Sequence, residues 1–223
     1  WINVDGVHDI DVIEKLGHHF GVHSLTLEDT VNTSQRPKLE EFDAYLYIVL
    51  KMLDYDSEHE KIRSEQVSLV VGPNFLVSFQ EQEGDVFNAV RDRIRKGRGR
   101  IRQGGSDYLA YALIDCIVDH YFLVLEQLGE RIEGLENGIY ENTGPDLLRD
   151  IFRLKQEMIY LRKQVWPLRE TLSHMLKLES PLVKDASRVF FVDEETELVT
   201  RIPGILLPLF AFAQFGPLPD KGE

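Results

Sequence analysis

The chain has 223 residues, of which 43% are hydrophobic and 28% are charged, values typical of a globular protein with one large or two small domains. Its single cysteine, Cys116, excludes a disulfide within the chain and favours a reducing, intracellular setting. The formal net charge of −13 argues against general nucleic-acid binding and is compatible with cations as partners.

The start of the chain shows the patterns of one strand and two helices. Residues 1–4 predict a short strand. Asp9 is a favourable N-cap for an amphipathic helix, which Gly21 ends. Ser24 is the expected N-cap of a second, shorter helix.

The next part of the chain alternates strands with a helix. Residues 44–55 are rich in Tyr, Ile, Val and Leu, which is typical of a buried strand. Two further apolar runs, residues 67–71 and 75–79, flank a Gly-Pro-Asn turn and predict a β-hairpin. Residues 85–96 return to helical spacing. This mixture predicts an α/β sandwich with a mixed sheet.

Two long helical patterns follow, joined by a short turn. Apolar residues recur at helical spacing from Ser106, the expected N-cap, to residue 139, which predicts a helix of roughly 50 Å. Asn-Thr-Gly-Pro at residues 142–145 predicts a turn. A second helical pattern, residues 147–172, contains Pro167, which we expect to kink the helix. Together the two patterns predict a long antiparallel helical hairpin.

An uncharged stretch near the C-terminal end is the candidate for a membrane span. It covers residues 202–218 and is interrupted by three prolines and two glycines. A spanning helix needs roughly 20 apolar residues and satisfies its own backbone, so we expect this stretch not to span a membrane and the chain as given to be soluble. No basic-then-apolar leader opens the sequence, so no signal peptide is expected.

Catalytic motifs are missing from the sequence. It has no HExxH pair of histidines, no Walker loop, no dinucleotide-binding glycine pattern and no serine elbow, so we expect no enzymatic activity. A basic segment, residues 91–102, holds seven basic residues and one acid. Such a segment is able to contact phosphates, but it lacks interleaved aromatic residues for base stacking. We favour a solvated helix end and loop that docks on acidic helices.

Acidic residues form clusters that suit hard cations. Mg²⁺ takes oxygen ligands and keeps most of its waters, so a few carboxylates at short spacing are chemically suited to bind it. An ordinary solvated acidic face is the alternative and the commoner case. The clusters are the helix face of Glu126, Glu130, Glu133 and Glu136, the pair Glu28 and Asp29, and the pair Asp115 and Asp119.

Six strings of this sequence, in order along residues 1–191, resemble those of the CorA family of magnesium and cobalt transporters. The strings are FGVHSLTLEDTVNTSQRPK from position 20, KMLDYD from 51, SEQVSL from 64, FQEQEGDVF from 79, DYLAYALIDCIVD from 107 and LRKQVWPLRE from 161. No single string is decisive, but the ordered set is specific to the family.

The resemblance implies the N-terminal cytoplasmic domain of a homopentameric transporter at the inner membrane. It implies an αβα sandwich with a mixed sheet in residues 1–105 and long funnel helices in residues 106–180. It further implies that residues 181–223 hold the start of a stalk helix and a tail unlike the family. The chain would then be truncated before the two membrane spans and their Gly-Met-Asn signature, which this sequence lacks.

By motif position, the resemblance implies a regulatory Mg²⁺ or Co²⁺ between neighbouring subunits. Asp29 would share one ion with Asp193, and Glu28 and Asp115 match an adjacent second site. Binding that favours the closed state shifts the population toward it, so plentiful magnesium is expected to close the channel. The alternatives are a soluble helical-hairpin scaffold whose acids are only surface, or a nucleic-acid-binding protein that uses the basic segment.

Overall fold

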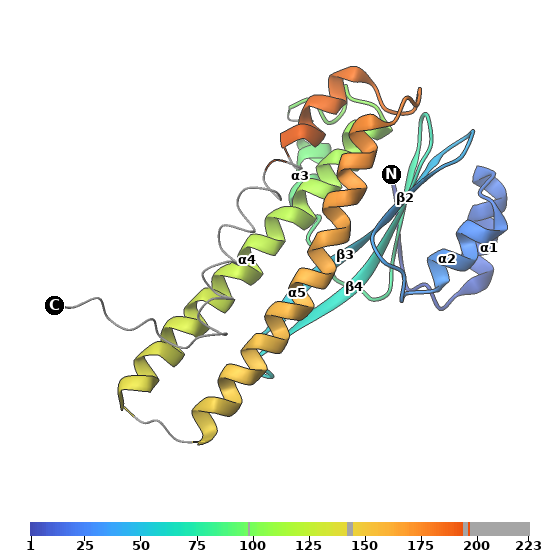
Figure 1. Ribbon diagram of the computed structural model, residues 1–223. Helices are drawn as coiled ribbons and strands as arrows, with labels where there is room; N and C mark the ends of the chain where they lie inside the picture. Colours follow the sequence, from blue (N-terminus) through green and yellow to red (C-terminus); the bar gives the residue numbers. More distant parts are fainter. Residues whose placement is uncertain (98, 142–144, 194–195, 197–223) are drawn as a thin grey trace.

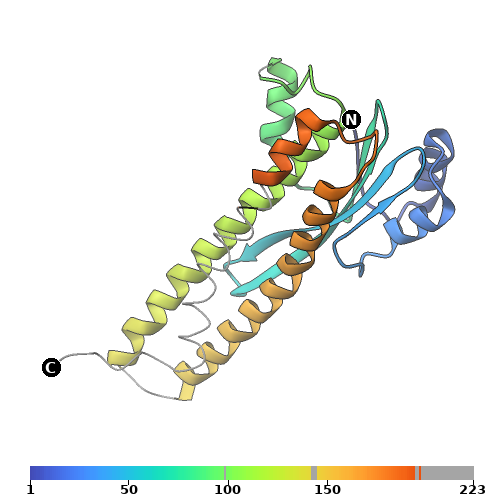
Figure 2. The ribbon, with the colours of Figure 1, turned by 45° about the horizontal axis from the view of Figure 1, so that its top comes forward.

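The structure is a computed structural model in which residues 1–97, 99–141, 145–193 and 196 are described. Five strands form one sheet, and helices cover both of its faces (Figure 1). The two longest helices extend beyond the sheet as a hairpin, which a second view shows from another side (Figure 2). The predicted αβα sandwich with a mixed sheet and a long helical hairpin is therefore confirmed.

The sheet has the strand order β1-β5-β4-β3-β2. Its strands are β1 (Ile2–Asp5), β2 (Lys38–Glu41), β3 (Leu46–Asp56), β4 (Lys61–Val71) and β5 (Leu76–Gln80). β1 runs parallel to β5, with Ile2 opposite Val77, whereas all the other neighbours are antiparallel. β1 and β2 are consequently the two edges of the sheet, and β3, β4 and β5 form its interior.

The central strands supply two separate cores, because successive side chains of a strand point to opposite faces. In β3, Tyr47 enters the core beneath α1 (Ile10–Phe20) and α2 (Ser24–Val31), whereas the next residue, Ile48, enters the core beneath the hairpin helices. Neither side chain is exposed to solvent. β3 is thus covered on both faces, which explains its nearly continuous apolar sequence.

α1 begins and ends as the sequence predicts. The Asp9 carboxylate accepts a hydrogen bond from the Val12 N–H at 3.2 Å, so it satisfies one of the free donors at the helix start. Gly21 ends the helix with a φ of 67°, a left-handed conformation that glycine adopts without a steric cost. Between these caps, Ile13 is fully buried and fastens α1 to the sheet.

Two predicted N-caps are wrong. α2 is capped by His23, whose Nδ1 accepts the Leu25 N–H at 3.2 Å, and Ser24 is the first residue of the helix. Ser106 is likewise the first residue of its helix. Its hydroxyl donates a hydrogen bond to the Gly72 carbonyl in the turn between β4 and β5. Both serines are therefore the first residue inside the helix, whereas the sequence predicted that they precede it as N-caps.

Three helices cover the face of the sheet opposite α1 and α2. α4 (Ser106–Glu141) lies along β3, α5 (Pro145–Lys177) packs on α4 and β2, and the short α3 (Asn88–Lys96) packs beside α4 (Figure 1). α5 continues through Pro167 as one helix. Since α4 packs directly on the sheet, the two units predicted to divide at residue 105 share one core; the division itself stays a prediction.

α4 is long and apolar enough to be a candidate membrane span by length and composition. The candidate covers Ser106–Gly138, and its most apolar window has a mean hydropathy of 1.5. In the structure, 56% of that window is buried inside the protein, against the sheet and α5. A core helix of a soluble domain has these same properties. The stretch considered from sequence, residues 202–218, lies outside the described residues.

Candidate metal-binding carboxylates

α2 places Glu28 and Asp29 beside the β2 edge of the sheet. Two buried threonines one turn apart, Thr26 and Thr30, form the face of α2 that meets the sheet. Thr26 Oγ1 lies 2.9 Å from the Tyr45 hydroxyl oxygen, and Thr30 Oγ1 donates to the Thr26 carbonyl at 2.8 Å. Because hydrogen bonds hold this face, Glu28 is left exposed and Asp29 partly exposed.

Asp29 is hydrogen-bonded through both carboxylate oxygens. Gln35 Nε2 donates to Oδ1 at 2.8 Å, and Lys38 Nζ donates to Oδ2 at 2.5 Å. The Lys38 ammonium also donates to Glu40 Oε1 at 2.7 Å. Burial alone would lower the pKa of Lys38, but its hydrogen bonds to Asp29 and Glu40 raise that pKa above its ordinary value. The Asp29 carboxylate is therefore paired with the Lys38 ammonium in the absence of a metal ion.

A buried polar network supports the residues that follow Asp29. Lys51 Nζ donates to the Thr33 carbonyl at 2.7 Å and to Gln66 Oε1 at 3.3 Å. Gln66 Nε2 in turn donates to the carbonyls of Asn32 and Asp29, at 3.1 and 3.3 Å. Burial lowers the pKa of Lys51. Sequence reasoning missed this network, although Lys51, a lysine inside an apolar strand run, was a usable signal.

Asp115 lies on α4, on the other side of the sheet. The Tyr111 hydroxyl, one turn earlier, donates to Asp115 Oδ1 at 3.2 Å. The Tyr111 ring stacks on Phe190, with the ring centroids 5.0 Å apart. Phe190 belongs to a helical segment, residues 185–193, which includes the exposed Asp193. Asp115 and Asp193 therefore belong to two helices that pack against each other through aromatic rings.

The structure leaves the predicted ligands in two separate groups. Glu28 and Asp29 lie on α2, whereas Asp115 lies on α4 across the sheet. Across the described ranges, no group of three or more His, Cys, Asp or Glu side chains is placed to hold a metal ion. The donors fit the chemistry of Mg²⁺, which prefers oxygen ligands and retains waters, and carboxylates also bind divalent first-row metals.

The remaining charged clusters lie at the surface. The acidic face of α4, Glu126, Glu130, Glu133 and Glu136, is exposed along its length. In the basic segment, Arg91 forms an ion pair with the partly buried Asp85, and Lys96 pairs with Asp92 at 2.8 Å. Arg102 Nε donates to the Ile94 carbonyl at 2.6 Å, near the end of α3. These basic residues hold α3 and its C-terminal end.

Comparison with known proteins identifies relatives along most of the chain. The model of the family described as CorA-like Mg²⁺ transporter protein matches residues 1–200. The Cobalt/magnesium transport protein CorA of Thermotoga maritima is 45% identical over 193 residues, which are 86% of this chain and 55% of the relative. The putative metal ion transporter YfjQ of Bacillus subtilis is 26% identical over 86% of this chain and 59% of its own length. The chain thus spans a little over half the length of these relatives.

Solved structures share the fold. The complete CorA magnesium transporter of Methanocaldococcus jannaschii superposes with a TM-score of 0.80 at 16% identity, covering 92% of this chain and 64% of that protein. The soluble domain of the same transporter gives a TM-score of 0.73 at 17% identity, covering 90% of this chain and 82% of that domain. The match over residues 1–200, together with this sandwich and helical hairpin, establishes that the chain belongs to the CorA-like Mg²⁺ transporter family.

Proposed function

We propose that this chain is the cytoplasmic regulatory domain of a magnesium or cobalt transporter, and that Mg²⁺ or Co²⁺ bound between its subunits favours the closed channel. The family and the Thermotoga relative, a cobalt/magnesium transport protein, support the transport role. Transport itself requires a membrane part, which we place in the length of such relatives that this chain does not match. The proposed partners are four further copies of the chain and the inner membrane, on its cytoplasmic side.

The placement of the carboxylates is the observation that most supports ligation between subunits. One chain holds Glu28 and Asp29 at one face of the sheet and Asp115 at the other. Two adjacent chains, in contrast, can present the first group of one subunit to the second group of its neighbour. Asp193 follows the segment that packs on Tyr111, beside Asp115, so it is proposed to belong to the second group.

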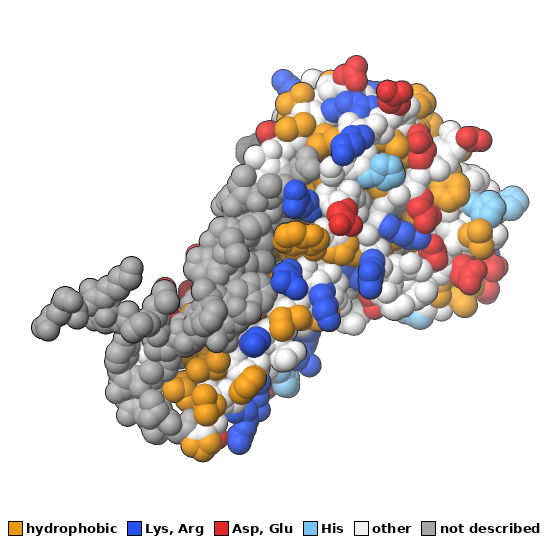
Figure 3. Space-filling view, in the orientation of Figure 1, with side chains coloured by type: hydrophobic (Ala, Val, Ile, Leu, Met, Phe, Trp, Pro, Cys, Tyr) orange, Lys and Arg blue, Asp and Glu red, His pale blue; other side chains and the backbone are white. Residues whose placement is uncertain are grey.

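The charge distribution of the surface also suits a ring. Figure 3 shows Lys and Arg side chains spaced along α5, and Asp and Glu side chains gathered over α1, α2 and the nearby part of the sheet. The exposed basic residues of α5 include Arg149, Arg153, Arg162 and Lys163. In a ring, each subunit presents one surface to a different surface of its neighbour. Opposite charges on two such surfaces favour this head-to-tail arrangement.

The proposed regulation follows from electrostatics. Carboxylates of two subunits that face each other without a counter-ion repel, which favours separation of the subunits. A bound divalent cation supplies the positive charge that neutralises them. Asp29 is partly exposed and Glu28 exposed, so both are able to hold an ion that keeps part of its water shell. If the closed state binds the ion more tightly than the open state, a rising concentration of the ion shifts the population toward closed.

Calorimetric titration with Co²⁺ and Mg²⁺ tests the proposal. The parent chain is expected to bind both ions, and Asp29→Ala and Asp115→Ala variants are expected to lose at least tenfold in affinity. Glu58→Ala is the matched control, because Glu58 is an exposed carboxylate in the turn between β3 and β4 and belongs to none of the predicted acidic clusters; its affinity should equal that of the parent. Sedimentation velocity with and without Co²⁺ measures association of the subunits.

Two results would contradict the proposal. If Asp29→Ala and Asp115→Ala bind the cations as tightly as the parent, the assigned ligands are wrong. If the parent binds neither ion, the chain is not a cation sensor. Binding to polynucleotides with a steep dependence on salt would favour the nucleic-acid reading of the basic segment instead.

A further inference from the structure

We propose that Lys38 is a tethered counter-cation of Asp29, which a divalent cation displaces on binding, and that Lys38 thereby sets the affinity of the regulatory site. This inference rests on the proposed function, because it presumes that Asp29 is a ligand. It adds a residue that is not a ligand, lies on a different element from Asp29, and controls how tightly the ion is held.

Both oxygens of the Asp29 carboxylate accept hydrogen bonds within the chain. Lys38 Nζ lies 2.5 Å from Asp29 Oδ2, and Gln35 Nε2 lies 2.8 Å from Oδ1, so each carboxylate oxygen already has a donor. The side chains of Lys38 and Asp29 are only 25% and 30% exposed, so water screens this pair less than a fully exposed one. A divalent cation at Asp29 would face a full positive charge at hydrogen-bond distance. The divalent cation therefore has to displace the Lys38 ammonium from Asp29.

The Lys38 ammonium has two further partners besides Asp29. Lys38 and Glu40 are two positions apart on β2, so their side chains project from the same face of the strand. Glu40 Oε1 lies 2.7 Å from Lys38 Nζ, and the centroid of the Tyr47 ring lies 5.5 Å from it. A carboxylate and an aromatic face both stabilise an ammonium. Lys38 therefore keeps two favourable contacts after it releases Asp29. Its displacement leaves no ammonium without a partner.

Lys38 lies where the edge of the sheet meets the helix that carries the proposed ligands. β2 is an edge strand of the sheet, and Lys38 joins this edge to α2, on which both Glu28 and Asp29 lie. Without metal, the Lys38 ammonium neutralises Asp29. With metal, the divalent ion replaces one positive charge by two. Lys38 thus weakens cation binding without preventing it, which makes the site respond at higher ion concentration.

Replacement of Lys38 tests this directly. Lys38→Met keeps a long apolar side chain but removes the competitor, so Co²⁺ affinity measured by calorimetry is expected to rise about tenfold, since a hydrogen bond between charged groups no longer has to be broken. Lys38→Arg retains the charge and should leave the affinity unchanged or lower. In an Asp29→Asn background, Lys38→Met should change the affinity less than twofold, because the pair is already absent.

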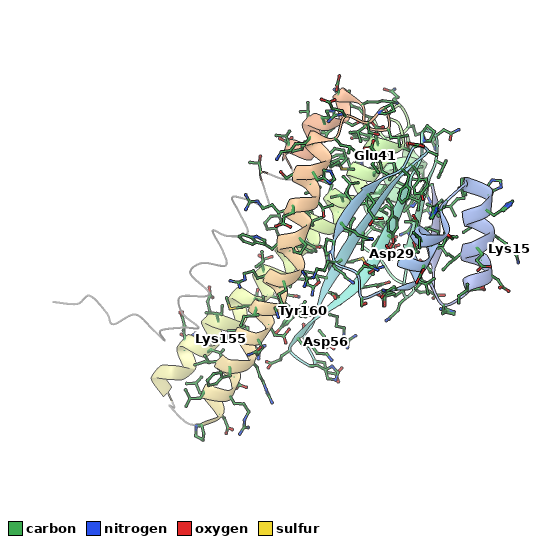
Figure 4. All side chains as sticks on the ribbon, turned by 45° about the vertical axis from the view of Figure 1, so that its right-hand side comes forward. Lys15, Asp29, Glu41, Asp56, Lys155 and Tyr160 are labelled. Carbon is green, nitrogen blue, oxygen red and sulfur yellow. The ribbon has the colours of Figure 1, made fainter. Side chains whose placement is uncertain are left out.

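A charge-matched control separates this contact from the general electrostatic field. Lys15 is exposed on the outer helix α1, and Figure 4 shows it pointing away from Asp29 and the sheet. Lys15→Met removes the same charge, and we expect a change of less than twofold. Lys38→Gln keeps a neutral donor and should give an intermediate gain, which also provides a folded variant if Lys38→Met is unstable.

The outcomes distinguish the inference from the proposed function. If Lys38→Met and Lys38→Gln tighten Co²⁺ binding no more than Lys15→Met does, Lys38 is not a competitor; a loss of binding in Asp29→Ala would still uphold the sensor. If the gain from Lys38→Met persists at full size in the Asp29→Asn background, the lysine acts elsewhere and the inference is overturned. If the parent chain does not bind Co²⁺, the proposed function fails first.

Discussion

Gln66→Leu removes the centre of the buried network beneath the end of α2. Gln66 is 2% exposed, and its side chain accepts from Lys51 and donates to the carbonyls of Asn32 and Asp29. Leucine has a similar volume but no polar atom. The variant therefore leaves the buried Lys51 ammonium with the Thr33 carbonyl alone, and it removes the hydrogen bonds to the partly buried carbonyls of Asn32 and Asp29. The lost acceptor of the buried ammonium costs about 1–3 kcal/mol and each lost amide hydrogen bond about 0.5–1.5 kcal/mol, so we expect the free energy of unfolding to fall by about 3 kcal/mol.

Urea denaturation followed by circular dichroism measures this loss. The midpoint should fall with little change in the m-value, and the melting temperature should fall by roughly 6–12 °C, since 1 kcal/mol corresponds to about 2–4 °C for a protein of this size. Gln156→Leu is the matched control, because Gln156 is exposed on α5; its stability should change by no more than about 0.5 kcal/mol.

A double variant tests the physical reason for the loss. Lys51→Met with Gln66→Leu replaces both polar side chains by apolar ones, so no buried ammonium is left without its partner. We expect the double variant to be more stable than the sum of the two single changes predicts, by about 1–3 kcal/mol. The reasoning is refuted if Gln66→Leu lowers the free energy of unfolding by less than about 1 kcal/mol, or if the two changes are additive.

Two further predictions concern the packing of α1 and the acid stability of α3. A Cβ atom at Gly17 would overlap the Leu27 side chain, which has to move. Overpacking costs about 1–3 kcal/mol and alanine gains about 1 kcal/mol in helix propensity, so Gly17→Ala should lower the melting temperature slightly. A melting temperature above that of the parent would contradict this, and Leu27→Ala should relieve the overlap. Burial alone would raise the pKa of Asp85, but hydrogen bonds from Arg91 and the Phe87 N–H lower it below its ordinary value. Because the folded-state pKa is the lower one, this stabilisation is complete above about pH 4 and is lost as the pH falls through the folded-state pKa. Urea unfolding from pH 7 to pH 2.5 should show Asp85→Asn less stable than the parent at neutral pH and the difference shrinking below about pH 4; a difference that does not depend on pH would contradict the assignment.

Local periodicity predicts the long helices of this chain closely. The helix expected over residues 106–139 ends at Glu141, because its apolar stripe packs on the sheet and on α5. The edge strand β2 was not predicted, nor was the polar first half of β4, residues 61–66. Both are strands because β3 pairs with them. Pairing with β3 makes strands of these two polar segments although neither has the apolar run by which a buried strand is predicted, and an edge strand such as β2 also tolerates charged residues.

The candidate site could likewise be predicted from the sequence only in part. Glu28, Asp29, Asp115 and Asp193 were named from sequence strings, and the structure places them on α2, on α4 and within residues 185–193. Their role as ligands stays a prediction. The contact of Asp29 with Lys38 could not be predicted, because it exists only once β2 has paired with β3 and α2 has docked. The electrostatic environment of a carboxylate depends on tertiary contacts that its own sequence segment does not specify.

The parallel pairing of β1 with β5 has a consequence for the order in which this chain acquires its structure during synthesis. Ile2 is opposite Val77, so β1 leaves the ribosome long before β5, its neighbour among the described strands. At about 5–20 residues per second, roughly 4–15 s separate the two strands. The antiparallel pairs of β2, β3 and β4 join segments much closer in sequence and have a smaller loop-closure cost. β1 is therefore expected to join a sheet whose antiparallel part has already formed, so that among these five strands the first in sequence is the last to be paired.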